Sequence, residues 1–474
     1  MRRMSTVTLS GIILFVAACS VPPANQSSTG AGNATLFEGA RLITGDEAPP
    51  IEDSAFVVQD GRFTSVGRRG DVQTPEGAAR VDLTGKTVMP GIIEAHAHLG
   101  YWKDLKPSAE NFTRDNLLSD LRRFAYHGVT AVLSMGADRR EIAWLLRDEL
   151  RANPRPDAAM YLSAGGFSTP KGGPAPPLDA AVRVVTNQEE VRKEIQELVA
   201  KKADFVKVWQ DVRRELMPRP LIEFLIAEAH RNNLRVVAHT HAMSDFKHLL
   251  RSGLDAFAHP TWRQTEVEPV DDELIALFKA HPNVPVMPGF WTPRHEIYGA
   301  RPYWLDDPLL AETFTPAEIK ALENAKTPSD APQTWASGPV PRSMKRLKAA
   351  GVRFVLGTDM GGGFSLEHDP TPAYLGWSTH IEMESMVKAG LTPREVITAA
   401  TRDSAQFFGI DQIGMVAAGK NADFLILDAN PLDNIANTRR ISRVHLRGRE
   451  VDRAALRTQL SGGSAAATRL PTTH

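Results

Sequence analysis

Two histidines one residue apart, His96 and His98, follow the apolar pair Ile92 and Ile93 in this 474-residue chain. Alternate side chains of an extended strand share a face, so both imidazoles are expected to point the same way and Ala97 the opposite way. Neutral imidazole is a frequent ligand of divalent cations, and two imidazoles on one face can hold one ion from two directions. A single pair of this kind is weak evidence, and a metal site needs further ligands.

Further nitrogen and oxygen donors lie in four other short apolar runs. The runs are 205–209, 234–239, 254–259 and 353–359, and their donors are Lys207, His239, His259 and Asp359. Runs of this length, rich in Val, Ala, Leu and Phe, are typical of strands buried in a parallel sheet. Because parallel strands bring their carboxyl ends to one edge of the sheet, we expect the donors to meet there.

The ligand order His-x-His, Lys, His, His, Asp resembles that of the amidohydrolase superfamily, in particular its imidazolonepropionase-like and prolidase-like branches. The resemblance extends over residues 33–451, and all six ligand positions carry the expected residue types. It implies an α/β fold, a (β/α)8 TIM barrel, with these ligands on strands 1, 4, 5, 6 and 8. It also implies two divalent metal ions, for which zinc is expected.

The implied activity is hydrolysis of an amide-type C–N bond in a dipeptide, an N-acyl amino acid, a cyclic amide, or a carbamate or urea. His96, His98 and Asp359 are expected to hold the more buried ion, and His239 and His259 the second. A water shared by two such ions loses a proton near neutral pH. Asp359 is the expected catalytic residue, because its carboxylate can orient that water, accept its remaining proton and pass it to the leaving nitrogen. The alternative for Asp359 is an ordinary turn or N-cap residue.

Lys207 shares a strand face with Phe205 and Trp209, and if that face is inward the lysine enters the barrel. A charged ammonium there would be desolvated and would repel both cations. Carboxylation of the nitrogen by CO2, as in related binuclear amidohydrolases, would create an anion with two oxygens that bridges the ions. The alternative is a lysine that reaches out of the barrel mouth to water or to a substrate carboxylate.

Two other hydrolase classes use a related set of ligands. An ester, lactone or phosphotriester hydrolase uses the same metal pair, although that branch lacks the flanking β segments of this chain. A mononuclear, deaminase-like hydrolase would be built on His96, His98, His239 and Asp359. The fold by itself does not choose among these substrates.

Three further residues are candidate substrate contacts. His241 shares the strand face of His239, and it is also compatible with a place behind the ligands or in the core. The insertion 289–342 follows the expected seventh strand, so it is expected to rise over the catalytic face as a lid. Arg294 and Arg301 lie among aromatic residues of this insertion, which favours a pocket for a carboxylate beside an apolar group.

The remaining elements must position these residues. The barrel is expected to span 88–414, with further strands at 129–135, 158–163 and 284–287 and amphipathic helices between them. In the family, segments equivalent to 34–87 and 415–457 form one small β-sandwich domain. Asp60-Gly61 predicts a hairpin turn in this domain, and Thr392 followed by Pro393 predicts the start of a helix that runs to Phe408.

The first 19 residues are typical of an export signal: two arginines precede an apolar stretch, 12–18, that is too short to span a membrane. The only cysteine, Cys19, ends the sequence Val-Ala-Ala-Cys, which resembles a bacterial lipobox, in which the cysteine is lipidated. The alternative is an ordinary signal peptide cleaved nearby. We therefore expect an exported lipoprotein, periplasmic or membrane-anchored, with residues 20–33 as a linker and 458–474 as a disordered tail.

Composition narrows the expected partners. Hydrophobic residues make up 42% and charged residues 23% of the chain, which is usual for a soluble globular protein. A formal net charge of −1 gives no reason to expect nucleic acid. We expect a small-molecule substrate and contact with a membrane only through the lipid anchor, and the sequence is compatible with a homo-oligomer.

Overall fold

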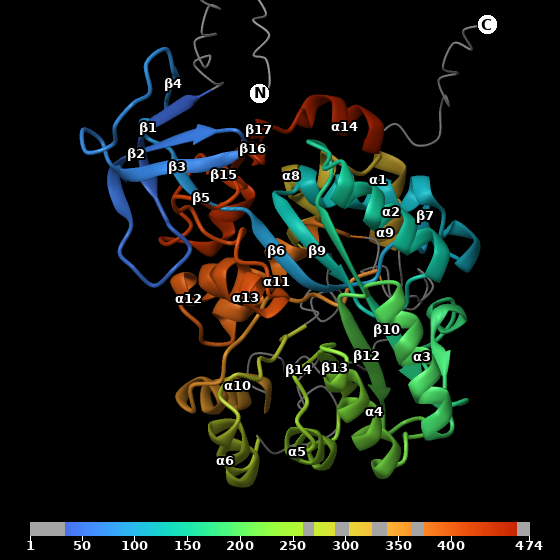
Figure 1. Cartoon of the computed structure of the whole chain (residues 1–474). Coiled ribbons are helices and arrows are strands. Elements are labelled where there is room, and N and C mark those ends of the chain that lie inside the picture. The colour runs from blue at the N-terminus through green and yellow to red at the C-terminus, as the bar shows by residue number, and fades with distance from the viewer. Residues whose placement is uncertain (1–33, 259–269, 290–302, 325–338, 362–373, 462–474) are drawn as a thin grey trace, which may run out of the picture.

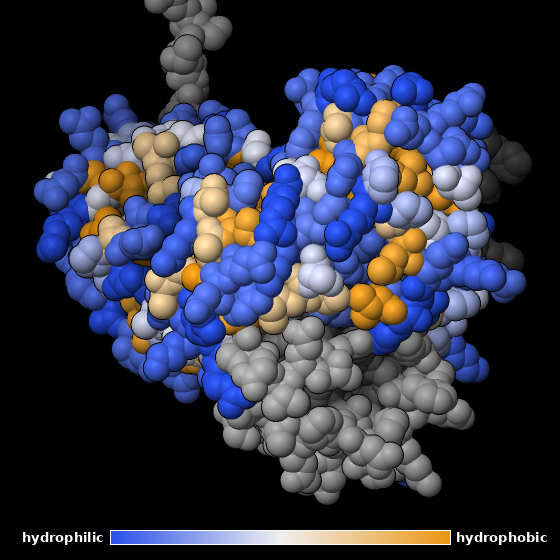
Figure 2. Space-filling model, turned by 90° about the horizontal axis from the view of Figure 1, so that it is seen from below, coloured by the Kyte–Doolittle hydropathy of each residue, from blue (hydrophilic) through white to orange (hydrophobic). Residues whose placement is uncertain are grey.

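The computed structural model describes residues 34–258, 270–289, 303–324, 339–361 and 374–461. A parallel sheet surrounded by helices forms the body of the molecule, and a second sheet is built from both ends of the described chain (Figure 1). Among the residues described, no helix is long and apolar enough to cross a membrane. The face shown in Figure 2 is largely hydrophilic, and its hydrophobic residues form small separate groups.

The central sheet confirms the predicted alternation of parallel strands and helices. Its strands, in spatial order, are β14 (Ala256–Phe257), β13 (Val236–Thr240), β12 (Phe205–Gln210), β10 (Met160–Ser168), β9 (Val129–Ser134) and β6 (Ile92–Ala97), with β11 (Arg183–Val184) beside β10. Isolated parallel bridges continue the sheet from Phe257 to Val286, from Val286 to Phe354, and from Met360 back to Ala97. This mixed α/β arrangement is consistent with the barrel of the resemblance. The predicted strand 284–287 is reduced to the bridges at Val286.

Helices cover the outer face of this sheet (Figure 1). They are α1 (Arg114–Tyr126), α2 (Arg140–Ala152), α3 (Gln188–Ala200), α4 (Arg219–Arg231), α5 (Met243–Arg251), α6 (Asp272–Ala280), α10 (Pro339–Ala349) and α11 (Trp377–Lys388). The strands are buried on both faces. Val206 and Val208 belong to an outer cluster of buried side chains, which lies between the sheet and the helices. Phe205 belongs to a second, inner cluster, together with Phe407. Burial on both faces explains why these strands are continuous apolar runs.

β10 extends to Ser168, beyond the predicted end at Ser163. Two consecutive glycines, Gly165 and Gly166, are a common signal for the end of a strand. Here they serve a close approach instead, because a Cβ atom on Gly166 would lie 2.0 Å from the carbonyl oxygen of Gly136. The glycines therefore allow β10 to pack against the segment that follows β9.

The second sheet joins the two ends of the described chain, as predicted. Its strands are β17 (Arg449–Glu450), β16 (Ile441–Leu446), β15 (Phe424–Leu427), β5 (Thr87–Pro90), β1 (Thr35–Leu42), β2 (Ile51–Gln59) and β3 (Arg62–Arg68), with β4 (Ala79–Asp82) paired to β1. Met89 of β5 pairs with Leu425 of β15. These strands are hydrogen-bonded as one sheet, and their division into the two layers of a β-sandwich stays a prediction.

Two local predictions are confirmed. Asp60 and Gly61 connect β2 to β3 with positive φ angles of 50° and 77°, as the expected hairpin turn requires. Thr392 caps α12 (Pro393–Thr398) in a capping box with Glu395. The helix continues through a π-helical turn, Ala399–Asp403, into α13 (Ser404–Phe408).

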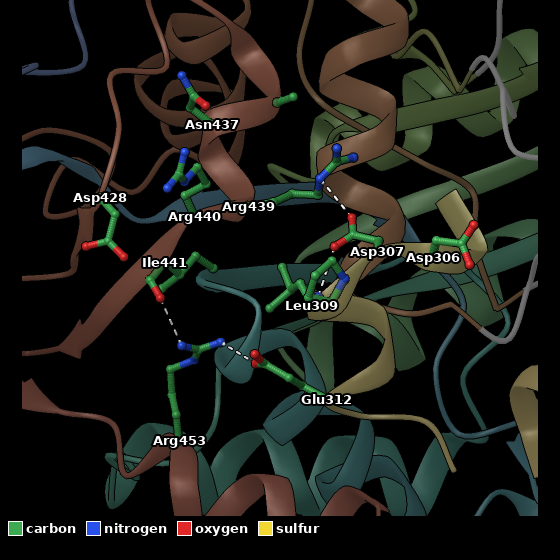
Figure 3. A pocket seen from close by; sticks show the side chains of 12 residues that line it. Asp306, Asp307, Leu309, Glu312, Asp428, Asn437, Arg439, Arg440, Ile441 and Arg453 are labelled. Carbon is green, nitrogen blue, oxygen red and sulfur yellow. Dashed lines mark hydrogen bonds and ion pairs between the residues drawn. The ribbon is translucent and has the colours of Figure 1, made fainter. Parts of the chain in front are cut away.

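The described part of the insertion lies against α1 and the C-terminal segment. It contains η4 (Tyr303–Asp306), α8 (Pro308–Ala311) and α9 (Pro316–Asn324). Arg123 of α1 donates to the carbonyl oxygen of Thr313 at 2.9 Å, and Arg453 pairs with Glu312 at 3.2 Å. A cavity of about 530 Å³ lies between this segment and residues 436–441, which lead into β16 (Figure 3). The predicted lid over the catalytic face would have to be formed by 290–302 or 325–338, which lie outside the described residues.

Candidate metal centre

Three predicted ligands converge at the carboxyl end of the parallel sheet. Nε2 of His96 lies 3.2 Å, and Nε2 of His98 3.1 Å, from the same oxygen of Asp359, Oδ1. Both imidazoles are buried, and the carboxylate side chain is only 11% exposed. Two imidazole nitrogens and a carboxylate oxygen are a donor set that zinc and related divalent ions bind. These three residues fit the more buried ion of the prediction.

The backbone holds the ends of β6 and of the segment 353–360 together at this point. The N–H of Asp359 donates to the carbonyl oxygen of His96, and the N–H of His98 to that of Met360, each at 2.7 Å. Asp359 has a φ of 60°. Aspartate tolerates this left-handed conformation better than most residues, because its short side chain can bond locally. The turn places its carboxylate between the two imidazoles.

Lys207 lies beside these ligands. Its side chain is fully buried, and its Nζ lies 3.4 Å from Nε2 of His96 and 5.3 Å from the ring centre of Trp209. Burial, and next the positive charge of Lys207, lower the pKa of His96 to about 3. His96 is therefore neutral at physiological pH, which is the state that binds a metal ion.

A second group of potential ligands contains His239, His241 and Asp211. Nε2 of His239 lies 3.6 Å from Oδ2 of Asp211, and the rings of His239 and His241 are 4.7 Å apart. Burial lowers the pKa of His239 to about 4. The structure thus brings His241 next to a predicted ligand.

The sequence interpretation missed Asp211, which follows β12 directly. Its carboxylate is 4% exposed and accepts hydrogen bonds from Nε and Nη2 of Arg213 at 2.9 Å and 2.7 Å. Burial would raise the pKa of Asp211, but the nearby His239 and the hydrogen bonds from Arg213 outweigh burial and hold this pKa far below its usual range. An anionic Asp211 can fix the orientation of the His239 ring, as carboxylates commonly do for metal-binding histidines. In the sequence, the position of Asp211 directly after a predicted strand was the feature that could have identified it as a site residue.

A second residue missed from the sequence is Glu94, two residues before His96. It is fully buried, and burial raises its pKa to about 7 against the opposing effect of hydrogen bonds from the N–H groups of Thr358 and His96. Its oxygens are occupied by these donors and by the hydroxyl of Thr379. Glu94 therefore lies behind the ligands rather than among them.

Four predicted residues lie outside the part of the chain that the structure describes. They are the metal ligand His259, the substrate contacts Arg294 and Arg301, and the lipidation site Cys19. The carboxylate pocket at the two arginines stays a prediction.

Residues 87–268 and 333–451 match the model of the Amidohydrolase family, and these two ranges contain all six predicted metal ligands. The chain belongs to the amidohydrolase family. This amidohydrolase is accordingly an enzyme, a hydrolase of carbon–nitrogen bonds, in a superfamily that depends on metal ions. The convergence of His96, His98 and Asp359 agrees with that dependence.

The amidohydrolase has relatives along most of its length. Ochratoxinase from Aspergillus niger is 23% identical over 449 residues, which cover 86% of this chain and 84% of the relative. Imidazolonepropionase from Deinococcus radiodurans is 24% identical over 417 residues, which cover 85% of this chain and 92% of that protein.

Solved structures share the fold. Phenylurea hydrolase B superposes with a TM-score of 0.70 at 22% identity, over 93% of this chain and 100% of its own. A Xaa-Pro dipeptidase with bound methionine superposes with a TM-score of 0.66 at 19% identity, over 88% of this chain and 99% of its own. At these identities the similarity establishes the fold alone.

Proposed function

We propose that this protein is a binuclear amidohydrolase on a (β/α)8 barrel, which uses two divalent ions, with zinc expected, to cleave an amide-type C–N bond of a small molecule. The observation that supports the proposal most is the approach of His96 and His98 to one oxygen of Asp359, with the buried Lys207 beside them. The proposed substrates are a dipeptide, an N-acyl amino acid, a cyclic amide, and a carbamate or urea; by their names, a dipeptidase and a phenylurea hydrolase with the same fold act on two of these classes.

His96, His98 and Asp359 would hold the first ion and His239 and His259 the second, and a carboxylated Lys207 would contact both. Bound divalent ions polarise a substrate carbonyl and lower the pKa of a coordinated water. Burial keeps His96 and His239 neutral, so their nitrogens are available as ligands without loss of a proton. A carboxylated Lys207 would carry the negative charge that offsets the two cations, which an ammonium in this buried position cannot do.

Asp359 moves the proton. Its carboxylate lies between two imidazole nitrogens and is partly exposed at the end of the sheet, where a substrate enters. It accepts a proton from the attacking water and donates it to the leaving nitrogen, which departs as a neutral amine. His241, next to His239, would contact the substrate.

The proposal can be tested by measuring hydrolysis of these substrates with the enzyme before and after its metal is removed by a chelator. Removal of the metal is expected to lower kcat/KM for the best substrate by more than about a hundredfold, and added Zn2+ should restore it. Elemental analysis of the active enzyme should give two ions per chain. One ion per chain with full activity would instead favour the mononuclear, deaminase-like site, and activity confined to esters or lactones would contradict C–N hydrolysis by this chain.

The proposed location is the bacterial envelope, with a lipid on Cys19 as the only membrane contact and a small molecule as the only required partner. Cells that express the protein should incorporate a fatty-acid analogue into wild type and not into Cys19→Ser. The variant should be released into the soluble periplasmic fraction. Equal absence of label and equal solubility of the two proteins would exclude lipidation and leave an ordinary cleaved signal peptide.

A further inference from the structure

The hydrogen-bond ladder between β6 and the segment 353–360 is interrupted where the metal ligands emerge. Below the interruption, the N–H of Ala95 donates to the carbonyl oxygen of Leu356 at 2.8 Å. Above it, the N–H of Asp359 donates to His96 at 2.7 Å. Between these bonds, the N–H groups of His96 and Thr358 both donate to Oε1 of Glu94, at 3.0 Å and 2.9 Å. A side-chain carboxylate thus accepts two backbone bonds in the middle of the ladder.

A strand irregularity turns Glu94 toward this position. The pairing of β6 with β9 shifts between Glu94 and Ala97. Ala95 packs in the inner cluster, and the next residue, His96, also points inward, to Lys207. Ala97 packs in the outer cluster. Two consecutive inward residues require a bulge. Glu94 therefore lies on the outer side, away from the metal ligands.

The other carboxylate oxygen of Glu94 is fixed by α11. The hydroxyl of Thr379 donates to Oε2 at 3.1 Å, and both Glu94 and Thr379 are fully buried. With three donors on two oxygens, the carboxylate connects β6, the segment that carries Asp359, and the helix that follows it. Loss of an acceptor here would leave backbone N–H groups buried without a partner, which is unfavourable.

We infer that Glu94 is a positioning residue, whose carboxylate replaces a strand carbonyl at the interruption and so fixes where His96, His98 and Asp359 enter the metal site. The inference rests on the proposed function only in that a divalent ion binds these three residues. Glu94 acts through the backbone of His96 and Thr358 and does not touch the ion. The metal site depends on the distance to which the side chain of Glu94 extends its oxygens, and not on the charge of the carboxylate.

Two substitutions separate reach from charge. Glu94→Gln keeps an oxygen at the same distance for both N–H groups, whereas Glu94→Asp keeps the charge and shortens the side chain by one methylene. In a Zn2+ titration against a chromophoric chelator, Glu94→Gln should stay within about threefold of the wild-type affinity, and Glu94→Asp should bind at least about tenfold more weakly. A Gln variant as weak as the Asp variant, or an Asp variant with wild-type affinity, would overturn the inference.

Two controls identify effects of general destabilisation. Thr379→Val removes one contact to the carboxylate and keeps both hydrogen bonds from the backbone N–H groups of His96 and Thr358, so it should lower Tm and leave the Zn2+ affinity within about threefold of wild type. Asp423→Ala removes a buried carboxylate that accepts the N–H of Arg447 at 2.7 Å in the second sheet, and should behave likewise. A wild-type protein that binds no divalent ion would contradict the proposed function and not the role of the Glu94 carboxylate as an acceptor.

Amide hydrogen exchange tests the acceptor role of Glu94 in the wild type itself. The inference can therefore be refuted even if a variant does not fold. In metal-free wild type and in Glu94→Gln, the amides of His96 and Thr358 should exchange as slowly as that of Ala95, which bonds within the ladder. Rapid exchange of either amide in folded wild type would show that Glu94 does not hold it, and the inference would fail.

Discussion

Lys207→Ala should lower kcat/KM by more than about a hundredfold and weaken the binding of the metal pair. Lys207 is fully buried with its nitrogen 3.4 Å from His96, so the substitution leaves a cavity where the proposed bridging anion would lie. Kinetics with the best substrate and elemental analysis of the purified variant measure the two effects. Acetate or propionate in the assay should restore part of the activity, because a small carboxylate can occupy the vacated position between the ions.

Lys247→Ala is a matched control for this prediction. Lys247 pairs with Glu273 at 2.7 Å on the outer side of the molecule, away from the ligands, and its loss should change kcat/KM by less than about twofold. A Lys207→Ala enzyme that retains two tightly bound ions and wild-type turnover would refute the bridge. The interpretation would then shift to a single ion held by His96, His98, His239 and Asp359.

Asp359→Asn should lower kcat by about 10²- to 10⁴-fold, because an amide can neither accept the proton of the attacking water nor donate one to the leaving nitrogen. Asparagine also tolerates the φ of 60° at this position, so the turn and the fold should persist. Steady-state kinetics should show the loss in kcat rather than in KM. Circular dichroism and Tm report whether the fold is intact.

The matched control is Asp423→Asn, which neutralises a buried carboxylate in the second sheet and should leave kcat unchanged. If Asp359→Asn kept kcat within about tenfold of wild type, Asp359 would be a ligand or a turn residue only, and another group would have to move the proton. Measured Zn2+ content separates these cases. A variant with full metal content and low kcat supports proton transfer by Asp359.

The sequence by itself predicted most of the strands of the parallel sheet and three ligands that the structure brings together, His96, His98 and Asp359. Alternation within a strand is a local property, so Val206 and Val208 on one face predict Lys207 on the other, and the structure has this arrangement in β12. The same holds for the hairpin at Asp60-Gly61 and the cap at Thr392, where neighbouring residues supply the interactions. Parallel strands also place their carboxyl ends at one edge, which predicts that the ligands meet.

Only the tertiary structure decided how the ligands meet and what holds them. The contact of Glu94 with Thr358 joins residues 264 positions apart, and the bulge that makes it possible has no signature in the alternation of β6. Asp211 gains its place beside His239 from the packing of β12 on β13. The segment that contains Thr313 lies against α1, a contact that its position after a strand did not predict. Such contacts depend on which surfaces of the strands and helices are still exposed after these elements have packed together. Residues throughout the chain determine this, so no local pattern predicts it.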